Sequence, residues 1–387
     1  MADVTVQDVF DVFYEDYRRG HKVSGVQAKA AWCIMNCKTG ALGANVSACE
    51  DCGSIHMHFN SCRNRCCPMC QELPKQKWVD ARKEDVLNAP YYHVVFTLPE
   101  ELNPVVYGNQ KLLYDVLYRC ASETLNELSL DEKHLGAKIG YICILHTWGS
   151  AMNYHPHLHC IVLGGGLDAK NKWRDNGEDF FLPIQAVSKL FKGKYMAYLK
   201  QLWKEGKLEY HGSASKYRNH YTFKELLNTC YNKPWNPYCK KTFNGAQSVI
   251  QYLGKYTHRI AISNHRIVRM DDKTVTFMMK DYTEDGCWKE LTITGVEFIR
   301  RFLMHVPPKR FVRIRHYGIL GNRTKKEKMT LCRNLLGCKK YISAMKAMDT
   351  AQILQHLYGI NICCCKDCGG RLIKDIPHKS LRIHCET

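Results

Sequence analysis

The sequence predicts an α+β fold, in which helices cover an antiparallel sheet, with a cysteine-rich module before it and a basic region after it. Three observations indicate this fold. Residues 33–70 hold eight cysteines and two histidines, β-rich segments alternate with helical ones from residue 91 onward, and Arg and Lys are dense over 309–348. The chain has 387 residues, of which 45% are apolar and 11% aromatic, so a packed core is expected and global disorder is not.

The N-terminal segment is expected to be helical. Apolar residues recur at helical spacing within residues 5–35, at Val6, Val9, Phe10, Phe13 and Tyr17. After the cysteine-rich stretch, residues 75–89 are expected to form a connecting helix.

The central part of the chain alternates between strand and helix patterns. β-Branched and aromatic runs bounded by Gly, Pro or polar turns predict strands, and longer segments with apolar residues three and four apart predict helices. The expected strands are 91–98, 141–148 and 157–163, and the expected helices are 103–128, 185–205 and 244–258. Residues 206–243 carry no pattern that assigns them.

The last third of the chain predicts a pair of small hairpins over 265–293 and a short helix over 294–305, which stops before two prolines. These elements suggest four consecutive parts. They are a helical segment at 1–32, a cysteine module at 33–74, an α+β domain at 75–264 and a basic C-terminal region at 265–387.

Two CxxC pairs in the cysteine module predict a zinc site. Cys49 and Cys52 form the first pair and Cys67 and Cys70 the second, with fourteen residues between the pairs. Zinc binds four thiolates tetrahedrally, and a CxxC turn presents two sulfurs to one ion. We therefore expect a zinc ribbon in which these four cysteines bind one Zn²⁺.

The remaining cysteines and histidines offer ligands for a second zinc ion, with buried free thiols as the alternative. The C-terminal CxxC pair has no obvious partner pair in the sequence. The candidate ligands for a second zinc are Cys37, His56, Cys62, Cys66, Cys365 and Cys368. Arg63 and Arg65 lie between expected ligands and are candidate contacts to DNA phosphates.

A His-x-His pair predicts a different metal site. His157 and His159 flank one apolar residue, and strand side chains two residues apart point to the same face. Neutral imidazole binds Mn²⁺ and Zn²⁺, whereas Mg²⁺ prefers oxygen ligands. A third ligand is not assigned by the pattern, and the candidates for it are Asn153, His155 and Gln247.

Two tyrosines on the expected helix over 244–258 are candidate nucleophiles. Tyr252 and Tyr256 are four residues apart, so their phenols lie on one helix face. Lys255 and Arg259 add positive charge beside them. A core face would not require these cations, whereas a phosphate beside the phenols would. A nearby cation also helps a phenol, whose free pKa is about 10, to ionise.

The overall charge favours a polyanionic partner. Lys plus Arg number 56 and Asp plus Glu number 37, which gives a net charge of +19 and most simply indicates nucleic acid. The sequence shows neither a signal-peptide pattern nor a segment apolar enough to span a membrane. We expect a cytoplasmic protein, associated with the nucleoid through DNA, in which the 21 cysteines are metal ligands and buried thiols rather than disulfides.

Together these blocks resemble the HUH single-strand endonucleases, and within them the rolling-circle transposases of the insertion-sequence ninety-one family. The resemblance spans roughly residues 49–264, in the family's order. It rests on CxxC followed by SCRNRCCPMCQ at 61–71, HPHLH at 155–159 and YLGKYTHRIAISN at 252–264, with VVFTLP at 94–99 in support. Cys66 stands where many relatives have histidine, so the ligands of any second zinc are less predictable.

The resemblance implies a ferredoxin-like catalytic sheet and a chain that nicks and rejoins single-stranded DNA, at element ends and targets, through a 5′-phosphotyrosine. It places Mg²⁺ or Mn²⁺ on His157 and His159, zinc on the N-terminal cysteines, and the nucleophilic role on Tyr252 and Tyr256. The oligomeric state does not follow from it.

Three other functions stay open at this point. A plasmid or phage rolling-circle replication initiator would use the same chemistry. A zinc-dependent DNA-binding regulator would bind without cleaving. A metallohydrolase would use the histidines with water, but residues 150–165 offer no carboxylate to complete such a site.

Overall fold

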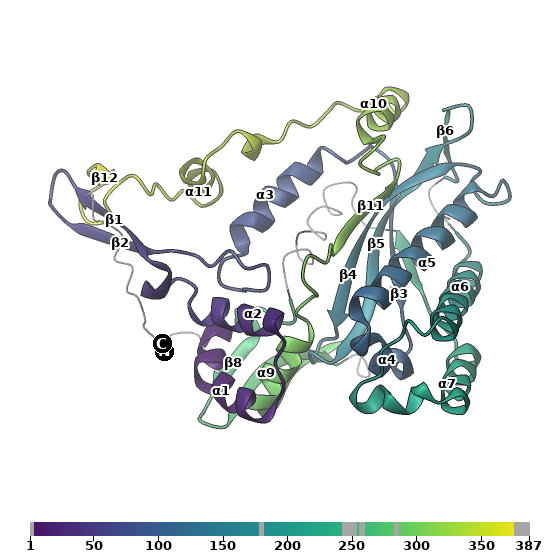
Figure 1. Cartoon of the computed structure of the whole chain (residues 1–387). Helices are drawn as coiled ribbons and strands as arrows, with labels where there is room; N and C mark the ends of the chain where they lie inside the picture. The colour runs from purple at the N-terminus through teal and green to yellow at the C-terminus, as the bar shows by residue number, and fades with distance from the viewer. Residues whose placement is uncertain (1–3, 178–181, 242–253, 255–259, 282–285, 375–387) are drawn as a thin grey trace. The chain divides into compact units, whose positions relative to one another are not determined.

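The structure, a computed structural model, describes residues 4–177, 182–241, 254, 260–281 and 286–374 (Figure 1). The chain divides into two compact units. The first comprises residues 1–81, 258–306 and 342–387, and the second comprises residues 82–257 and 307–341. The basic region expected over 265–387 therefore contributes to both units. Within the part of the chain that the structure describes, every helix is too short or too polar to cross a bilayer.

The second unit contains the larger sheet and the helices that cover it. Its elements are β3 (Tyr91–Thr97), α4 (Asn103–Gly108), α5 (Gln110–Leu130), β4 (Lys138–Trp148), β5 (Tyr154–Leu167), β6 (Trp173–Asp175), α6 (Ile184–Lys204), α7 (His220–Asn232), β7 (Tyr238–Lys241), β11 (Ile314–Gly318) and α10 (Lys325–Leu335), with 3₁₀ turns at Glu100–Leu102 and Gly212–Arg218.

The order of the strands in this sheet is ferredoxin-like. In chain order, β3 leads through α4 and α5 to β4, β4 turns into β5, and β5 leads through α6 and α7 to β7. In space these four strands lie in the order β7-β3-β5-β4, and each neighbouring pair is antiparallel. This βαββαβ arrangement confirms the expected α+β fold with an antiparallel sheet. β11 adds a strand beside β4, and β6 pairs with the end of β5.

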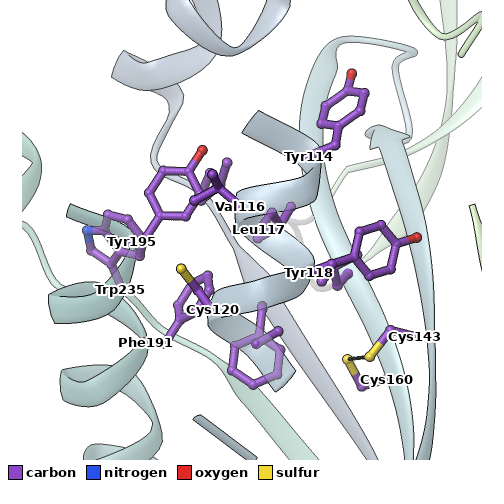
Figure 2. Packing of buried hydrophobic residues seen from close by; sticks show 14 of the residues in the cluster. Tyr114, Val116, Leu117, Tyr118, Cys120, Cys143, Cys160, Phe191, Tyr195 and Trp235 are labelled. Atoms are coloured by element: carbon purple, nitrogen blue, oxygen red, sulfur yellow. Dashed lines mark hydrogen bonds between the residues drawn. The ribbon is translucent and has the colours of Figure 1, made fainter. Parts of the chain in front are cut away.

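The core of the second unit lies between one face of this sheet and helices α5 and α6 (Figures 1 and 2). Alternate residues of the two central strands point into it, as do apolar residues of both helices. Among them are Tyr141 and Cys143 of β4, Leu158 and Cys160 of β5, Leu117 and Tyr118 of α5, and Phe191 and Tyr195 of α6. Because strand side chains alternate between faces, the residues between these core positions point to the face that the two helices do not cover.

Several boundaries differ from the sequence predictions for local reasons. The helix expected over 103–128 is two helices, because Asn109 leaves helical geometry and its amide donates to the carbonyls of Val105 and Glu209. The sequence also missed β11, whose basic residues hid a strand pattern. The expected tyrosine helix at 244–258 lies outside the described residues, apart from Gly254.

The first unit contains two small sheets and helices from both ends of the chain. Its elements are α1 (Val6–Gly20), α2 (Gly25–Met35), β1 (Ala44–Cys49), β2 (Ile55–Phe59), α3 (Glu72–Lys83, whose last two residues belong to the second unit), β8 (Ile267–Met270), β9 (Thr274–Asp281), β10 (Cys287–Thr294), α9 (Gly295–Met304), α11 (Thr350–Tyr358) and β12 (Leu372–Lys374), with 3₁₀ turns at Gly40–Leu42, Asn264–Arg266 and Ala344–Lys346.

Two predictions about the first unit are confirmed and one is refined. The hairpin pair over 265–293 is the antiparallel sheet β8-β9-β10, and the helix after it is α9. The helix expected over 5–35 is interrupted, because Ser24 caps a new helix. Helix α1 packs closely on α9, where a Cβ on Gly295 would lie 2.2 Å from the Phe13 ring. The other sheet has the order β12-β1-β2 and joins the C-terminal segment to the N-terminal hairpin.

Candidate metal centres

Three histidines of the second unit come together on the face of the sheet opposite α5 and α6. His157 and His159 lie on β5, and His146 lies on β4, directly across from His157 in the antiparallel register. One nitrogen from each ring lies within 4.8 Å of the others, which is close enough for a shared metal ion. His146 is 2% exposed and His157 is 9% exposed. The His-x-His spacing therefore does place both rings on one face, as expected.

Hydrogen bonds orient the two β5 histidines. His157 Nδ1–H donates to the carbonyl oxygen of His155 at 2.6 Å, which leaves Nε2 as the nitrogen with a lone pair. This Nε2 lies 3.0 Å from Nε2 of His159. The other nitrogen of His159, Nδ1, lies 2.8 Å from Nε2 of His93 on β3. Both Nε2 atoms thus converge, while both Nδ1 atoms are engaged elsewhere.

Burial keeps these imidazoles neutral. It lowers the pKa of His157 to about 3, that of His159 well below its usual value, and that of His93 to about 4, because the surroundings disfavour a charged ring. Neighbouring histidines lower the pKa of His157 and His159 further. Neutral imidazole is the form that binds a metal, so His157 and His159 can bind a cation at physiological pH.

The third member of the cluster was not among the candidates named from the sequence. His155 is not part of the group, and Asn153 is exposed in the turn that joins β4 to β5. The pairing of the two expected strands is the signal that could have found His146, because it aligns this residue with His157. Gln247, Lys255, Tyr252, Tyr256 and Arg259 all lie outside the described residues.

A group of four cysteines lies in the N-terminal part of the first unit. Its members are Cys37, Cys62, Cys67 and Cys70, and their sulfurs all lie within 4.8 Å of one another. Cys62 and Cys70 are 3.7 Å apart, and the backbone N–H of Asn64 donates to the Cys62 sulfur at 3.4 Å. Arg63 and Arg65, in the loop that carries Cys62 and Cys67, are both exposed, as phosphate contacts would need to be.

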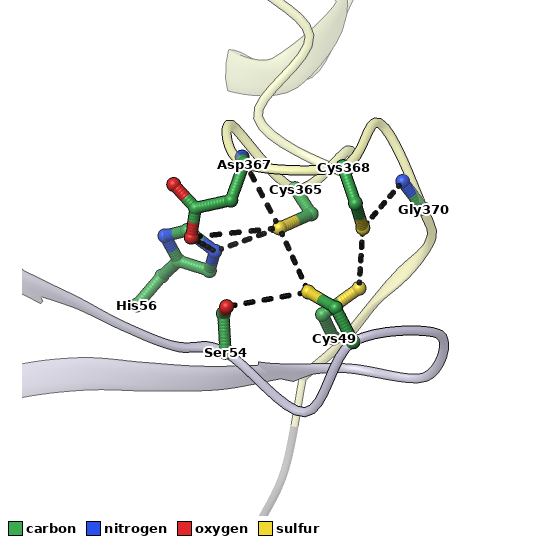
Figure 3. A network of polar contacts seen from close by, with 8 residues as sticks. Cys49, Ser54, His56, Cys365, Asp367, Cys368 and Gly370 are labelled. Atoms are coloured by element: carbon green, nitrogen blue, oxygen red, sulfur yellow. Dashed lines mark hydrogen bonds and ion pairs between the residues drawn. The ribbon is translucent and has the colours of Figure 1, made fainter.

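A second group of four cysteines joins distant parts of the chain (Figure 3). Cys49 and Cys52 meet Cys365 and Cys368, and the four sulfurs again lie within 4.8 Å of one another. The sulfurs of Cys49 and Cys368 are 3.4 Å apart, and those of Cys52 and Cys365 are 3.7 Å apart. His56 Nε2 lies 3.1 Å from the Cys365 sulfur.

The structure corrects the expected grouping of ligands. Cys49 and Cys52 do not share a site with Cys67 and Cys70, because β12 pairs with β1 and brings the C-terminal CxxC beside the first N-terminal one. Of the candidates for a second zinc, Cys66 belongs to neither four-cysteine group among the described residues, and it is buried. His56 lies beside the second group rather than within it.

Both four-cysteine groups suit zinc. Four sulfurs at mutual distances below 5 Å match the tetrahedral thiolate cage of a structural zinc site, in which all four positions are filled by protein. The histidine cluster has a different character, because the three nitrogens that the described residues supply would leave further coordination positions of a bound metal for water or substrate.

Comparisons with known proteins agree with these features. A family model described as transposase zinc-binding domain matches residues 9–98, and one described as putative transposase matches residues 140–328. The chain is 42% identical over 334 residues to "Putative transposase y4qJ" of Sinorhizobium fredii (strain NBRC 101917 / NGR234), covering 86% of this chain and 84% of that relative.

A second relative is more distant. The chain is 28% identical over 298 residues to "Transposase for insertion sequence element IS801" of Pseudomonas savastanoi pv. phaseolicola, covering 75% of this chain and 69% of the relative. No solved structure matches the chain. With its zinc-binding N-terminal domain, this chain belongs to the IS91 family of transposases.

Proposed function

We propose that this transposase cuts and rejoins single-stranded DNA through a covalent 5′-phosphotyrosine. The observation that carries the proposal is the cluster of His146, His157 and His159 on the face of a ferredoxin-like sheet opposite helices α5 and α6. The three imidazoles have converging nitrogens, and burial keeps His157 and His159 neutral, so the cluster would suit a cation; family membership makes DNA the substrate.

The three histidines would hold the catalytic cation. Imidazole is a good ligand for Mn²⁺ and a poor one for Mg²⁺, which prefers oxygen, so this donor set fits Mn²⁺ better of the two. When bound, such an ion would polarise the scissile phosphate. The hydrogen bonds of His157 to the His155 carbonyl and of His159 to His93 keep the metal-binding nitrogens pointed toward one another.

Tyr252 and Tyr256 are the proposed nucleophiles, on the strength of their spacing in the sequence. The phenol oxygen attacks phosphorus and loses its proton. The bond from phosphorus to the 3′-oxygen breaks, and that oxygen takes up a proton to become a free hydroxyl. The phosphodiester is conserved as a tyrosine ester, so a later attack by a 3′-hydroxyl restores a DNA strand without ATP. Two tyrosines allow two such transfers, one at the donor and one at the target.

Basic residues would bind and orient the DNA. Lys255 lies between the two tyrosines in the sequence and Arg259 follows them, and a cation there would stabilise the phenolate and neutralise phosphate. Arg63 and Arg65 are exposed on the zinc-binding domain and are proposed to contact the DNA backbone. The net charge of +19 supplies the general attraction.

A nicking assay tests the metal-dependent part of the proposal. Full-length protein is incubated with a labelled single-stranded element end and Mn²⁺ or Mg²⁺, with and without chelator. We expect chelation, or the double change His157→Ala and His159→Ala, to abolish nicking while DNA binding persists. The matched control is His211→Ala, which removes an exposed histidine of the same unit and should nick normally.

Two outcomes would contradict the proposal. Nicking by the double variant at the wild-type rate would place the metal site elsewhere. Binding of DNA with no cleavage by the wild-type protein, under any metal, would favour a regulator that binds DNA without catalysis.

A further inference from the structure

We propose that the chain holds a second zinc ion in a discontinuous site, in which the C-terminal segment completes the N-terminal zinc-binding domain. Cys49 and Cys52 supply one half of the site, and Cys365 and Cys368 supply the other. The zinc-binding family model ends at residue 98 and the transposase model at residue 328, so neither includes the C-terminal half.

The two halves are matched turns. They share the pattern CxDCG, which is CEDCG at residues 49–53 and CKDCG at residues 365–369. In each turn the final glycine has a positive φ, 73° at Gly53 and 80° at Gly369, which other residues rarely adopt. Two copies of one turn that face each other across four sulfurs form the arrangement of a zinc ribbon.

The backbone hydrogen bonds of the two turns also match. The glycine N–H donates to the carbonyl of the first cysteine, at 3.1 Å from Gly53 and 3.0 Å from Gly369. The N–H of that first cysteine donates to the carbonyl five residues later, at 2.9 Å to Ser54 and 2.7 Å to Gly370. The same sequence pattern thus forms the same turn twice. This repetition indicates that the sequence encodes the approach of the four cysteines.

Polar groups around the sulfurs suit thiolates. The N–H groups of Asp367 and Gly370 donate to the sulfurs of Cys365 and Cys368, each at 3.4 Å (Figure 3). Nε2 of His56 lies 3.1 Å from the Cys365 sulfur and, as a donor, adds a further contact to it. Such contacts stabilise the negative charge of metal-bound sulfur and fix its direction.

The surrounding structure holds the halves together at close range. Strand β12 pairs with β1 in antiparallel register, with Leu372 opposite Cys49, and the N–H of Glu50 donates to the Arg371 carbonyl at 3.0 Å. A Cβ on Gly370 would lie 2.2 Å from an Asp51 carboxylate oxygen, so a larger residue at this position would force the exposed Asp51 side chain to move. Strand β12 has three residues, all paired with β1, and strands of this length contribute little stability by themselves, so zinc would strengthen the attachment.

The site is separate from the group formed by Cys37, Cys62, Cys67 and Cys70. Two closed four-sulfur sites predict two zinc ions per chain. They also predict that loss of the second ion releases the C-terminal segment from the β1–β2 hairpin, while the first ion stays in place.

Thiol mapping on the wild-type, full-length protein tests the proposal without relying on transposition. The protein is purified without chelator, its zinc is measured by elemental analysis, and accessible cysteines are alkylated and identified by mass spectrometry during stepwise zinc removal. We expect two zinc ions per chain. We also expect Cys49, Cys52, Cys365 and Cys368 to be protected together and to become alkylated together in a step that releases one zinc.

A variant pair provides the control. The double change Cys365→Ser and Cys368→Ser should lower the zinc content from two to one and expose Cys49 and Cys52 to alkylation. The matched change Cys363→Ser and Cys364→Ser, which alters the neighbouring cysteines outside the group, should keep two zinc ions. Alkylation of Cys365 and Cys368 in zinc-loaded wild-type protein would overturn the proposal. So would release of Cys49 and Cys52 in the same step as Cys67 and Cys70, while Cys365 and Cys368 behave independently.

Discussion

Replacement of His93 by phenylalanine isolates one hydrogen bond that supports the histidine cluster. His93 Nε2 lies 2.8 Å from Nδ1 of His159, and the two rings are nearly parallel, with centroids 5.0 Å apart. Phenylalanine keeps an aromatic ring beside His159 and against Tyr238, but it has no acceptor for the His159 N–H. Without this acceptor, His159 would lose its preference for the tautomer that carries the proton on Nδ1. Its Nε2 would then less often have the lone pair that a metal needs.

The expected loss follows from the burial of this pair. Leaving a buried donor without an acceptor costs about 1–3 kcal/mol, and removing the partner of a metal-binding histidine weakens metal affinity by about 10- to 100-fold. These two ranges agree, because a tenfold change corresponds to about 1.4 kcal/mol. We therefore expect His93→Phe to bind Mn²⁺ about 10- to 100-fold more weakly than the wild type.

Titration of the full-length protein with Mn²⁺, followed by electron paramagnetic resonance of the free ion, measures this affinity directly. His93→Gln serves as the conservative variant, because its side-chain carbonyl can accept the same N–H and should recover part of the affinity. Equal Mn²⁺ affinity in the wild type and His93→Phe would refute the role assigned to His93. Equal losses in both variants would indicate a packing effect instead.

Two further predictions concern charge. Burial, together with Arg82 and Lys325, lowers the pKa of His316 to about 4, with Asp85 opposing them, so folding disfavours its protonation. The free energy of unfolding should therefore fall as pH drops from about 6.5 to 4, and His316 should account for at most about 3 kcal/mol of this fall. Denaturant unfolding across this pH range should show a smaller fall for His316→Gln than for the wild type. Parallel pH dependences for the two proteins would contradict the prediction. Affinity for single-stranded DNA should decrease steeply with salt, with a log–log slope near −0.7 per phosphate neutralised, and a flat slope in fluorescence titrations would exclude an extended phosphate-contacting surface.

The sequence predicted three strands of the sheet, because these strands are apolar runs with clear ends, whereas β6 and β7 are too short to show a pattern. β3, β4 and β5 lie close to their expected positions, and the alternation of β5 correctly placed His157 and His159 on one face. The sequence did not predict β11, because its basic residues mask the strand pattern and its stability comes from pairing with β4. Pairing partners are a property of the whole fold and not of a local segment.

The cysteine groups show the same limit. Spacing along the chain favoured joining the two N-terminal CxxC pairs, since they are separated by only fourteen residues. The fold instead uses a partner from the far end of the chain, because β12 can pair with β1. The repeated CxDCG pattern was a visible signal that two turns belong together, whereas Cys37 and Cys62 have no such local signature.

The central claim is that DNA becomes covalently attached to Tyr252 or Tyr256, and peptide mapping of the attached protein tests it most directly. Full-length protein is incubated with a single-stranded element end and Mn²⁺, the DNA-linked species is isolated under denaturing conditions, and the modified peptide is identified by mass spectrometry. We predict a phosphotyrosine linkage on one of these two tyrosines, lost when both are changed to phenylalanine. A linkage on another residue, or an undiminished adduct in the double variant, would contradict the proposed mechanism.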